Sequence, residues 1–154
     1  MKFKSILLFT LFLTLNSQQL TAGENGLISL KSSHSVPATM DRLVDILKKK
    51  GLTIFARIDH ALGAQKVKMQ LSSSQLVIFG NPKMGTPLMK CQMSSGLDLP
   101  LKALVWEDKN NQTWISYNAP AFLAERHALK KCGTKVIAKM TGALKKITTK
   151  AAAK

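Results

Sequence analysis

The chain has 154 residues, a length that accommodates one domain around a single hydrophobic core and excludes several large domains. Its two cysteines lie far apart and form no Cys-x-x-Cys pair, which excludes the common zinc-binding patterns. The net charge is +15 and is concentrated near the C-terminus, where eight lysines and no acidic residue lie between residues 130 and 154.

Residues 1–22 have the layout of a secretory signal peptide. Two lysines precede an apolar run over residues 6–15, and a polar stretch then leads to Ala22 and Gly23, near which we expect cleavage. The run is shorter than the roughly 20 apolar residues that span a bilayer, so a retained anchor helix is the less favoured alternative. We therefore expect an exported protein, periplasmic or secreted, whose mature form has no transmembrane segment.

The charge of the mature chain bears on its partners. Without the signal peptide the net charge is +13, of which residues 24–129 carry +5. Outside the cytoplasm such a chain meets anionic lipid or acidic polysaccharide more readily than nucleic acid, so we expect no nucleic-acid partner. The lysine-rich tail is the candidate for contact with an anionic surface.

Hydrophobic periodicity predicts alternating strands and helices along the rest of the chain. Strands are expected over residues 26–31, 52–60, 75–79, 101–107 and 113–118, with a ragged strand over 66–71 after a turn at 61–63. Helices are expected over residues 35–50, 86–93, 120–129 and 134–148. The apolar run at 75–79 is nearly continuous, which predicts a central strand buried on both faces.

The order of these elements predicts an α+β fold with a largely antiparallel sheet backed by helices. A hairpin turn at residues 108–112 joins two of the strands. We place the domain at residues 24–130 and a lysine-rich helix and tail at 131–154. The helix in this tail has one narrow apolar stripe, which favours packing on the domain or on a second subunit over lying on an anionic membrane.

The sequence GNPKMGTPLM at residues 80–89 follows a predicted strand and contains two glycines and two prolines. It is not a nucleotide-binding phosphate loop, because Gly85 is followed by Thr86 and Pro87 rather than by a lysine and a hydroxyl residue. We expect residues 80–85 to turn the chain and Thr86 to cap a helix that begins at Pro87. Gly85 is expected to need a backbone angle that only glycine adopts at low energy.

Two further sets of residues carry candidate chemistry. A disulfide between Cys91 and Cys132 would close a loop of about 42 residues and stabilise the fold by about 4 kcal/mol in the chain-entropy model, with free buried thiols as the alternative. His60 and His127 could act with a carboxylate in a metal-dependent or enzymatic protein. The candidate carboxylates are Asp59, Glu107, Asp108 and Glu125. No spacing forces these groups to converge, so the sequence favours a non-enzymatic role and no cofactor.

Four segments occur in an order and spacing that resemble one protein family. They are TIFARIDHALGA (53–64), LVIFGNPKMGTPLM (76–89), GLDLPLKALVWED (96–108) and WISYNAPAFLAERHAL (114–129). Together they resemble the domain-of-unknown-function 302 family. The resemblance implies a compact α+β domain, similar in outline to the TATA-binding protein and often a homodimer, with no assigned reaction and no implied DNA binding. Members commonly carry an acidic residue where this chain has Ala119.

Polar side chains lie at the expected ends of several strands and beside the glycine-containing loop, where clefts commonly form. Our first hypothesis is therefore an exported, non-catalytic, dimeric binding domain with a small polar cleft. The candidate cleft residues are Asp59, His60, Asn81, Thr86, Glu107, Asn118 and His127. Structural roles are the alternative: the two asparagines as turn caps, Arg126 as an ion-pair partner of Asp59 or Glu107, and Trp106 as a core residue.

Overall fold

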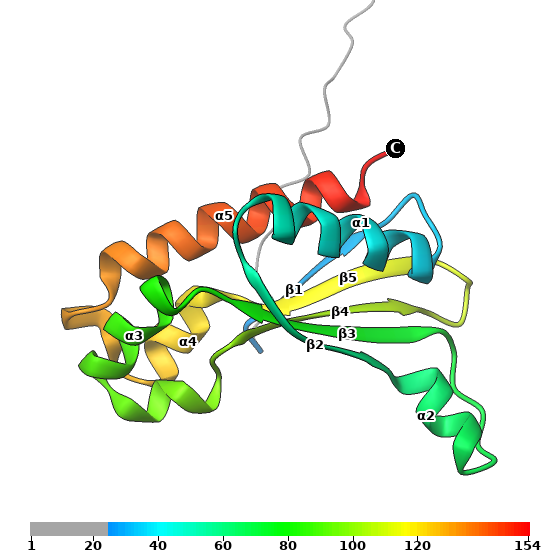
Figure 1. Cartoon of the computed structure of the whole chain (residues 1–154), viewed down its shortest axis with the longest axis horizontal. Helices are drawn as coiled ribbons and strands as arrows, with labels where there is room; N and C mark the ends of the chain where they lie inside the picture. Colours follow the sequence, from blue (N-terminus) through cyan, green and yellow to red (C-terminus); the bar gives the residue numbers. More distant parts are fainter. Residues whose placement is uncertain (1–24) are drawn as a thin grey trace, which may run out of the picture.

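The computed structural model describes residues 25–154, and the predicted signal peptide at 1–22 lies outside the described residues. These residues form a five-stranded antiparallel sheet with helices on one face, so the predicted α+β fold class is confirmed. Helices α1 (Val36–Lys49) and α5 (Thr134–Ala152) lie side by side over the sheet. Helices α3 (Pro82–Cys91) and α4 (Pro120–Arg126) lie at one end of the sheet, and α2 (His60–Lys66) projects from the other (Figure 1).

The strands pair in an order that differs from their order in the chain. They are β1 (Leu27–Lys31), β2 (Thr53–Asp59), β3 (Ser74–Gly80), β4 (Leu101–Glu107) and β5 (Thr113–Asn118), and the sheet order is β1-β5-β4-β3-β2. β4 is therefore the central strand. Val77 and Phe79 of β3 are buried, whereas Leu76 and Ile78 are only partly buried. The prediction that this strand is buried on both faces is wrong, because the helices over the sheet cover only one face (Figure 1).

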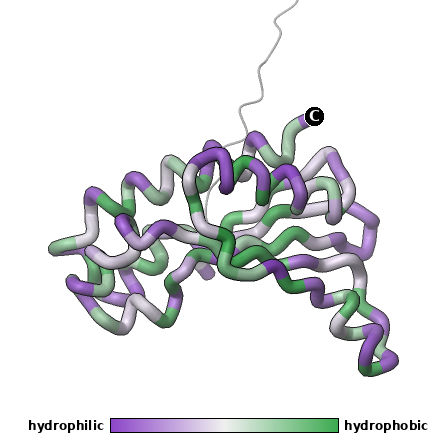
Figure 2. The backbone as a smooth tube through the Cα atoms, viewed as in Figure 1, coloured by the Kyte–Doolittle hydropathy of each residue, from purple (hydrophilic) through white to green (hydrophobic). Residues whose placement is uncertain are grey.

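The main core lies between the sheet and the two long helices. Its helical members are Val36, Met40, Leu43 and Leu47 from α1, and Leu144, Ile147, Ala151 and Ala152 from α5. In Figure 2 both long helices alternate between hydrophobic and hydrophilic residues, as expected of helices that bury one face. Gly51, which has a positive φ of 70°, follows α1 where the sequence predicts that this helix ends.

Helix α5 packs on the sheet and on α1 and extends beyond its predicted end at residue 148. The guanidinium group of Arg42 on α1 donates hydrogen bonds to the backbone carbonyls of Ala151 at 3.0 Å and Ala153 at 2.9 Å. Because Leu144 and Ile147 are buried in the core, the apolar stripe of α5 is not free to enter a membrane. The lysines of this helix remain exposed on its other side.

Helix α2 takes the place of the predicted turn at 61–63 and part of the predicted strand at 66–71, so both predictions are wrong. The carboxylate of Asp59 caps this helix by accepting a hydrogen bond from the Leu62 backbone N–H at 2.8 Å. No residue of α2 is buried, so its sequence has no hydrophobic periodicity that would predict a helix. Capping and the helix-favouring residues that follow Asp59 determine this segment.

Helix α3 begins at Pro82, five residues before the predicted start at Pro87. Asn81 caps it by accepting a hydrogen bond from the Lys83 backbone N–H at 2.9 Å, and the helix continues through Pro87. Gly85 therefore has no left-handed backbone conformation, and a Cβ at this position would lie 3.8 Å from Leu99 Cδ1, an ordinary contact. The expectation that Gly85 requires a glycine-specific angle is wrong, because the chain turns at Asn81 instead.

The face of the sheet opposite the helices carries two tryptophans. Trp106 on β4 and Trp114 on β5 are register partners whose ring centroids lie 6.4 Å apart. The Trp106 indole N–H donates to Ser116 Oγ at 2.8 Å, so Trp106 is a partly exposed residue of this face and not a core residue. The hydrogen bond from the Trp114 indole lowers the pKa of Asp108 from its usual value, and the hydrogen bond from the Gln112 backbone N–H lowers it further.

Candidate functional site

The seven predicted cleft residues divide between the two ends of the sheet. Neighbouring antiparallel strands place their C-terminal ends at opposite ends of a sheet. Asp59, His60 and Glu107 follow or end β2 and β4 at one end, and the other four residues lie at the opposite end. The structure therefore does not bring them together in one polar cleft.

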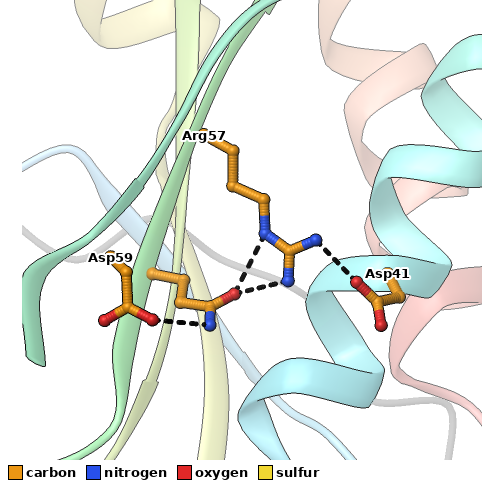
Figure 3. Close-up of polar contacts among 4 residues, drawn as sticks. Asp41, Arg57 and Asp59 are labelled. Carbon is orange, nitrogen blue, oxygen red and sulfur yellow. Dashed lines mark hydrogen bonds and ion pairs between the residues drawn. The ribbon is translucent and has the colours of Figure 1, made fainter. Parts of the chain in front are cut away.

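Asp59 belongs to a hydrogen-bonded network that connects α1 with β2 and β3 (Figure 3). Arg57 forms an ion pair with Asp41 of α1 at 2.6 Å and donates two hydrogen bonds to Gln75 Oε1. Gln75 Nε2 in turn donates to Asp59 Oδ2 at 3.0 Å, while Asp59 Oδ1 caps α2. Both carboxylate oxygens of Asp59 thus have protein partners, and the side chain has a structural role here.

The two candidate histidines belong to α2 and to the C-terminal end of α4, helices that lie at opposite ends of the sheet (Figure 1). His60 is the exposed first residue of α2, whereas His127 follows α4 and is only 6% exposed. His127 Nε2 lies 2.6 Å from Asp98 Oδ2, and His127 Nδ1 lies 3.1 Å from Ser94 Oγ. Within the described part of the chain, no three His, Cys, Asp or Glu residues are placed to hold a metal ion.

Asp98 is the carboxylate partner of His127 and is not among the four carboxylates predicted from the sequence. It precedes Leu99 and also lies 3.5 Å from the guanidinium group of Arg126, so the predicted pairing of Arg126 with Asp59 or Glu107 is wrong. Asp98 follows the short 3-10 helix η1 (Met93–Leu97), and His127 connects this segment to α4. The pair therefore fixes the segment that leads into β4.

An apolar pocket of about 290 Å³ lies between α3, α5 and the nearby ends of β2, β3 and β4. The strands and their flanks contribute Leu52, Phe55, Phe79, Gly80, Leu99, Pro100 and Leu101; α3 and its cap contribute Asn81, Pro82, Met84, Gly85, Thr86 and Met89; α5 contributes Met140, Ala143, Leu144 and Ile147. The stretch GNPKMGTPLM thus forms one wall of this pocket.

The chemistry of the pocket differs from that of the predicted cleft. Asn81 and Thr86 are the only lining residues with polar side chains, and Asn81 Oδ1 already caps α3. These two are also the only predicted cleft residues that line the pocket. Aromatic, aliphatic and thioether groups supply the rest of the surface, so the pocket suits an apolar ligand. These apolar residues were not among the predicted site residues, although Gly85 and Met89 have helical spacing once α3 is taken to begin at Pro82.

Cys91 and Cys132 do not line the pocket and are joined by a disulfide, with their Cα atoms 5.9 Å apart. Cys91 is the last residue of α3, and Cys132 follows the 3-10 helix η2 (Leu129–Lys131) just before α5. A second, smaller core lies beside the bridge. Its buried members are Leu88, Ala124, Leu129, Ile137 and Met140.

Residues 28–147 match the model of a family described as "Domain of unknown function DUF302". The chain is also similar to a solved structure, that of an uncharacterized conserved DUF302 protein from Bacillus stearothermophilus. The TM-score is 0.74 at 17% identity, and the match covers 82% of this chain and 98% of that one. At this identity the likeness shows the fold alone.

Two relatives are similar in sequence over a shorter stretch. The "Fluoride-specific ion channel FluC 1" of Brucella suis biovar 1 (strain 1330) is 43% identical over 106 residues, which are 69% of this chain and 42% of that protein. The protein of the same name from Brucella abortus biovar 1 (strain 9-941) is equally similar, with 39% of its length covered. The chain thus spans about two fifths of the length of these relatives. Among residues 25–154, no helix has the length and apolar character that crossing a membrane requires.

Proposed function

The chain belongs to the DUF302 family, and from that premise we propose that it is a binding domain that holds a small apolar ligand in the pocket between α3 and α5. The pocket itself is the observation that carries this proposal. Its volume of about 290 Å³ is near the lower limit of roughly 300–1,000 Å³ for ligand sites, which suits a small apolar ligand. Its nearly continuous apolar lining supports affinity through burial of apolar surface.

The two Brucella relatives are named as fluoride-specific ion channels, and that name refers to the whole proteins. The matching segment is less than half of each of them. The pocket described above also lacks the charged groups that would bind a small hydrated anion. We therefore assign ligand binding, and not ion conduction, to this domain.

Narrowing the pocket tests the proposal. Gly85→Leu places an apolar side chain on the pocket wall, so we expect binding of the fluorescent apolar probe N-phenylnaphthylamine to weaken about tenfold. Gly142→Leu is the matched control, because Gly142 lies in α5 with open space around its Cβ position. Fluorescence titration of both variants and the wild type measures the effect. Equal affinities in all three proteins would show that the probe does not use this pocket.

We propose further that the domain is exported, as residues 1–22 indicate, and that it forms a homodimer through β2 and α2. β2 is an edge strand, and an antiparallel edge pairing is compatible with two-fold symmetry. Around it lies a group of large exposed apolar residues: Phe55, Ile58, Leu62, Val67, Met69 and Leu71. Such a group is larger than the scattered apolar residues of most monomer surfaces.

N-terminal sequencing of the protein recovered from outside the cytoplasm tests export.

Substitution of the exposed apolar group tests the dimer. We expect wild-type protein to sediment as a dimer and Leu62→Lys with Val67→Lys to sediment as a monomer, because two ammonium groups in the contact cannot be desolvated favourably. Sedimentation equilibrium over a range of concentrations measures the change. Lys66→Glu, at an exposed position of the same helix, controls for a change of charge alone. A wild-type protein that stays monomeric at high concentration contradicts the proposal.

A further inference from the structure

The Cys91–Cys132 disulfide joins the two helical walls of the apolar pocket. α3 supplies the wall that contains Met84, Gly85 and Met89, and the bridge holds its last residue. α5 supplies the opposite wall, and Cys132 lies two residues before its start. The bridge therefore connects the ends of two helices that face each other across the pocket.

Besides the bridge, partly buried side chains hold α3: Met84 packs against the small core, and a Cβ on Gly96 of η1 would lie 3.0 Å from Met89 Cε. Its N-terminal end continues directly from β3 through Asn81, and Leu88 is its only buried residue. Leu88 packs against the small core beside the bridge, where a Cβ on Gly133 would lie 2.9 Å from Leu88 Cδ2. With Leu88 as its one fully buried residue, α3 uses the covalent link to keep its C-terminal half against the start of α5.

We propose that the Cys91–Cys132 disulfide sets the separation of α3 and α5, so that ligand affinity of the pocket depends on the redox state of these cysteines. This inference rests on the proposed function of the pocket. In the oxidised protein the wall is held in place before a ligand arrives, so binding does not have to order it. In the reduced protein α3 is free to move away from α5, and binding must order it.

The chemistry is thiol–disulfide exchange with a dithiol reductant. A thiolate of the reductant attacks Sγ of Cys132, which is exposed, and forms a mixed disulfide while Cys91 leaves as a thiolate and takes up a proton. The second thiol of the reductant then attacks its own mixed-disulfide sulfur and releases Cys132 as a thiol. Two electrons and two protons pass to the protein, and the reductant becomes a disulfide.

Two measurements on the full mature chain test the inference. Titration with N-phenylnaphthylamine is expected to give about tenfold weaker binding after reduction by dithiothreitol, and the same weaker binding for Cys91→Ala with Cys132→Ala with or without reductant. Amide hydrogen exchange is expected to rise in α3 on reduction while β3, β4 and β5 stay protected. Far-UV circular dichroism verifies that each form is folded.

The outcomes separate this inference from the proposed function. Oxidised wild-type protein that binds no probe contradicts the function, whereas the exchange measurement still reports whether the bridge holds α3. Reduced protein that binds the probe as tightly as the oxidised form, with α3 equally protected, overturns the inference. Loss of the whole fold on reduction overturns it too, because the bridge then acts on global stability and not on the pocket wall.

Discussion

His127→Ala is expected to lower the free energy of unfolding by about 2–4 kcal/mol, because it leaves a cavity and removes one hydrogen-bond partner each from Asp98 and Ser94. His127 is only 6% exposed, and the Asp98 side chain is 13% exposed. Water therefore has little access to replace the 2.6 Å contact between them. Urea denaturation followed by circular dichroism measures the difference.

His60→Ala is the control for this prediction. His60 is exposed and none of its neighbours in α2 is buried, so the change should stay within about 0.5 kcal/mol. Gly85→Ala should likewise not destabilise, because its Cβ meets only an ordinary contact and alanine favours a helix. If His127→Ala and His60→Ala lowered the free energy of unfolding equally, a buried structural role for His127 would be contradicted.

Ile147→Ala is expected to lower the free energy of unfolding by about 2–5 kcal/mol, as for other large-to-small substitutions in a core. Ile147 is 2% exposed and belongs to the main core, where α5 packs beside α1. The same denaturation experiment measures this change. A large loss shows that the lysine-rich segment is an integral part of the folded domain.

The neighbouring residue supplies the matched control. Lys146 is exposed on the same helix, so Lys146→Ala should change stability by no more than about 0.5 kcal/mol. A small effect of both substitutions would mean that α5 contributes little to the core in solution. Such a result would also remove one wall of the proposed pocket.

Much of the fold could be predicted from local pattern. The stripe of α1, the hairpin around Asp108 and the positions of β1, β4 and β5 all depend on residues close together in the chain. The errors occurred where two local signals competed. Asn81-Pro82 and Thr86-Pro87 both have the form of a helix start, and the backbone uses the first. α2 was missed because it buries nothing and so has no hydrophobic periodicity.

The candidate site was far less predictable. The sequence indicated Asn81 and Thr86 but placed them with Asp59 and His60, which lie at the other end of the sheet. Which strand ends meet depends on the antiparallel order of the sheet, and no single segment contains that information. The partner of His127 was missed for the same reason, since Asp98 is 29 residues away in the chain.

By itself the sequence determined the α+β class, the resemblance to the DUF302 family and the helix-forming stripes, because helix and strand preferences act between near neighbours. Only the tertiary structure decided that the stretch GNPKMGTPLM forms the wall of an apolar pocket. That pocket exists because α5 crosses the sheet opposite α3, which brings residues 140–147 beside residues 80–89. Packing between segments so far apart follows from burial of the shared core, and no local pattern encodes it.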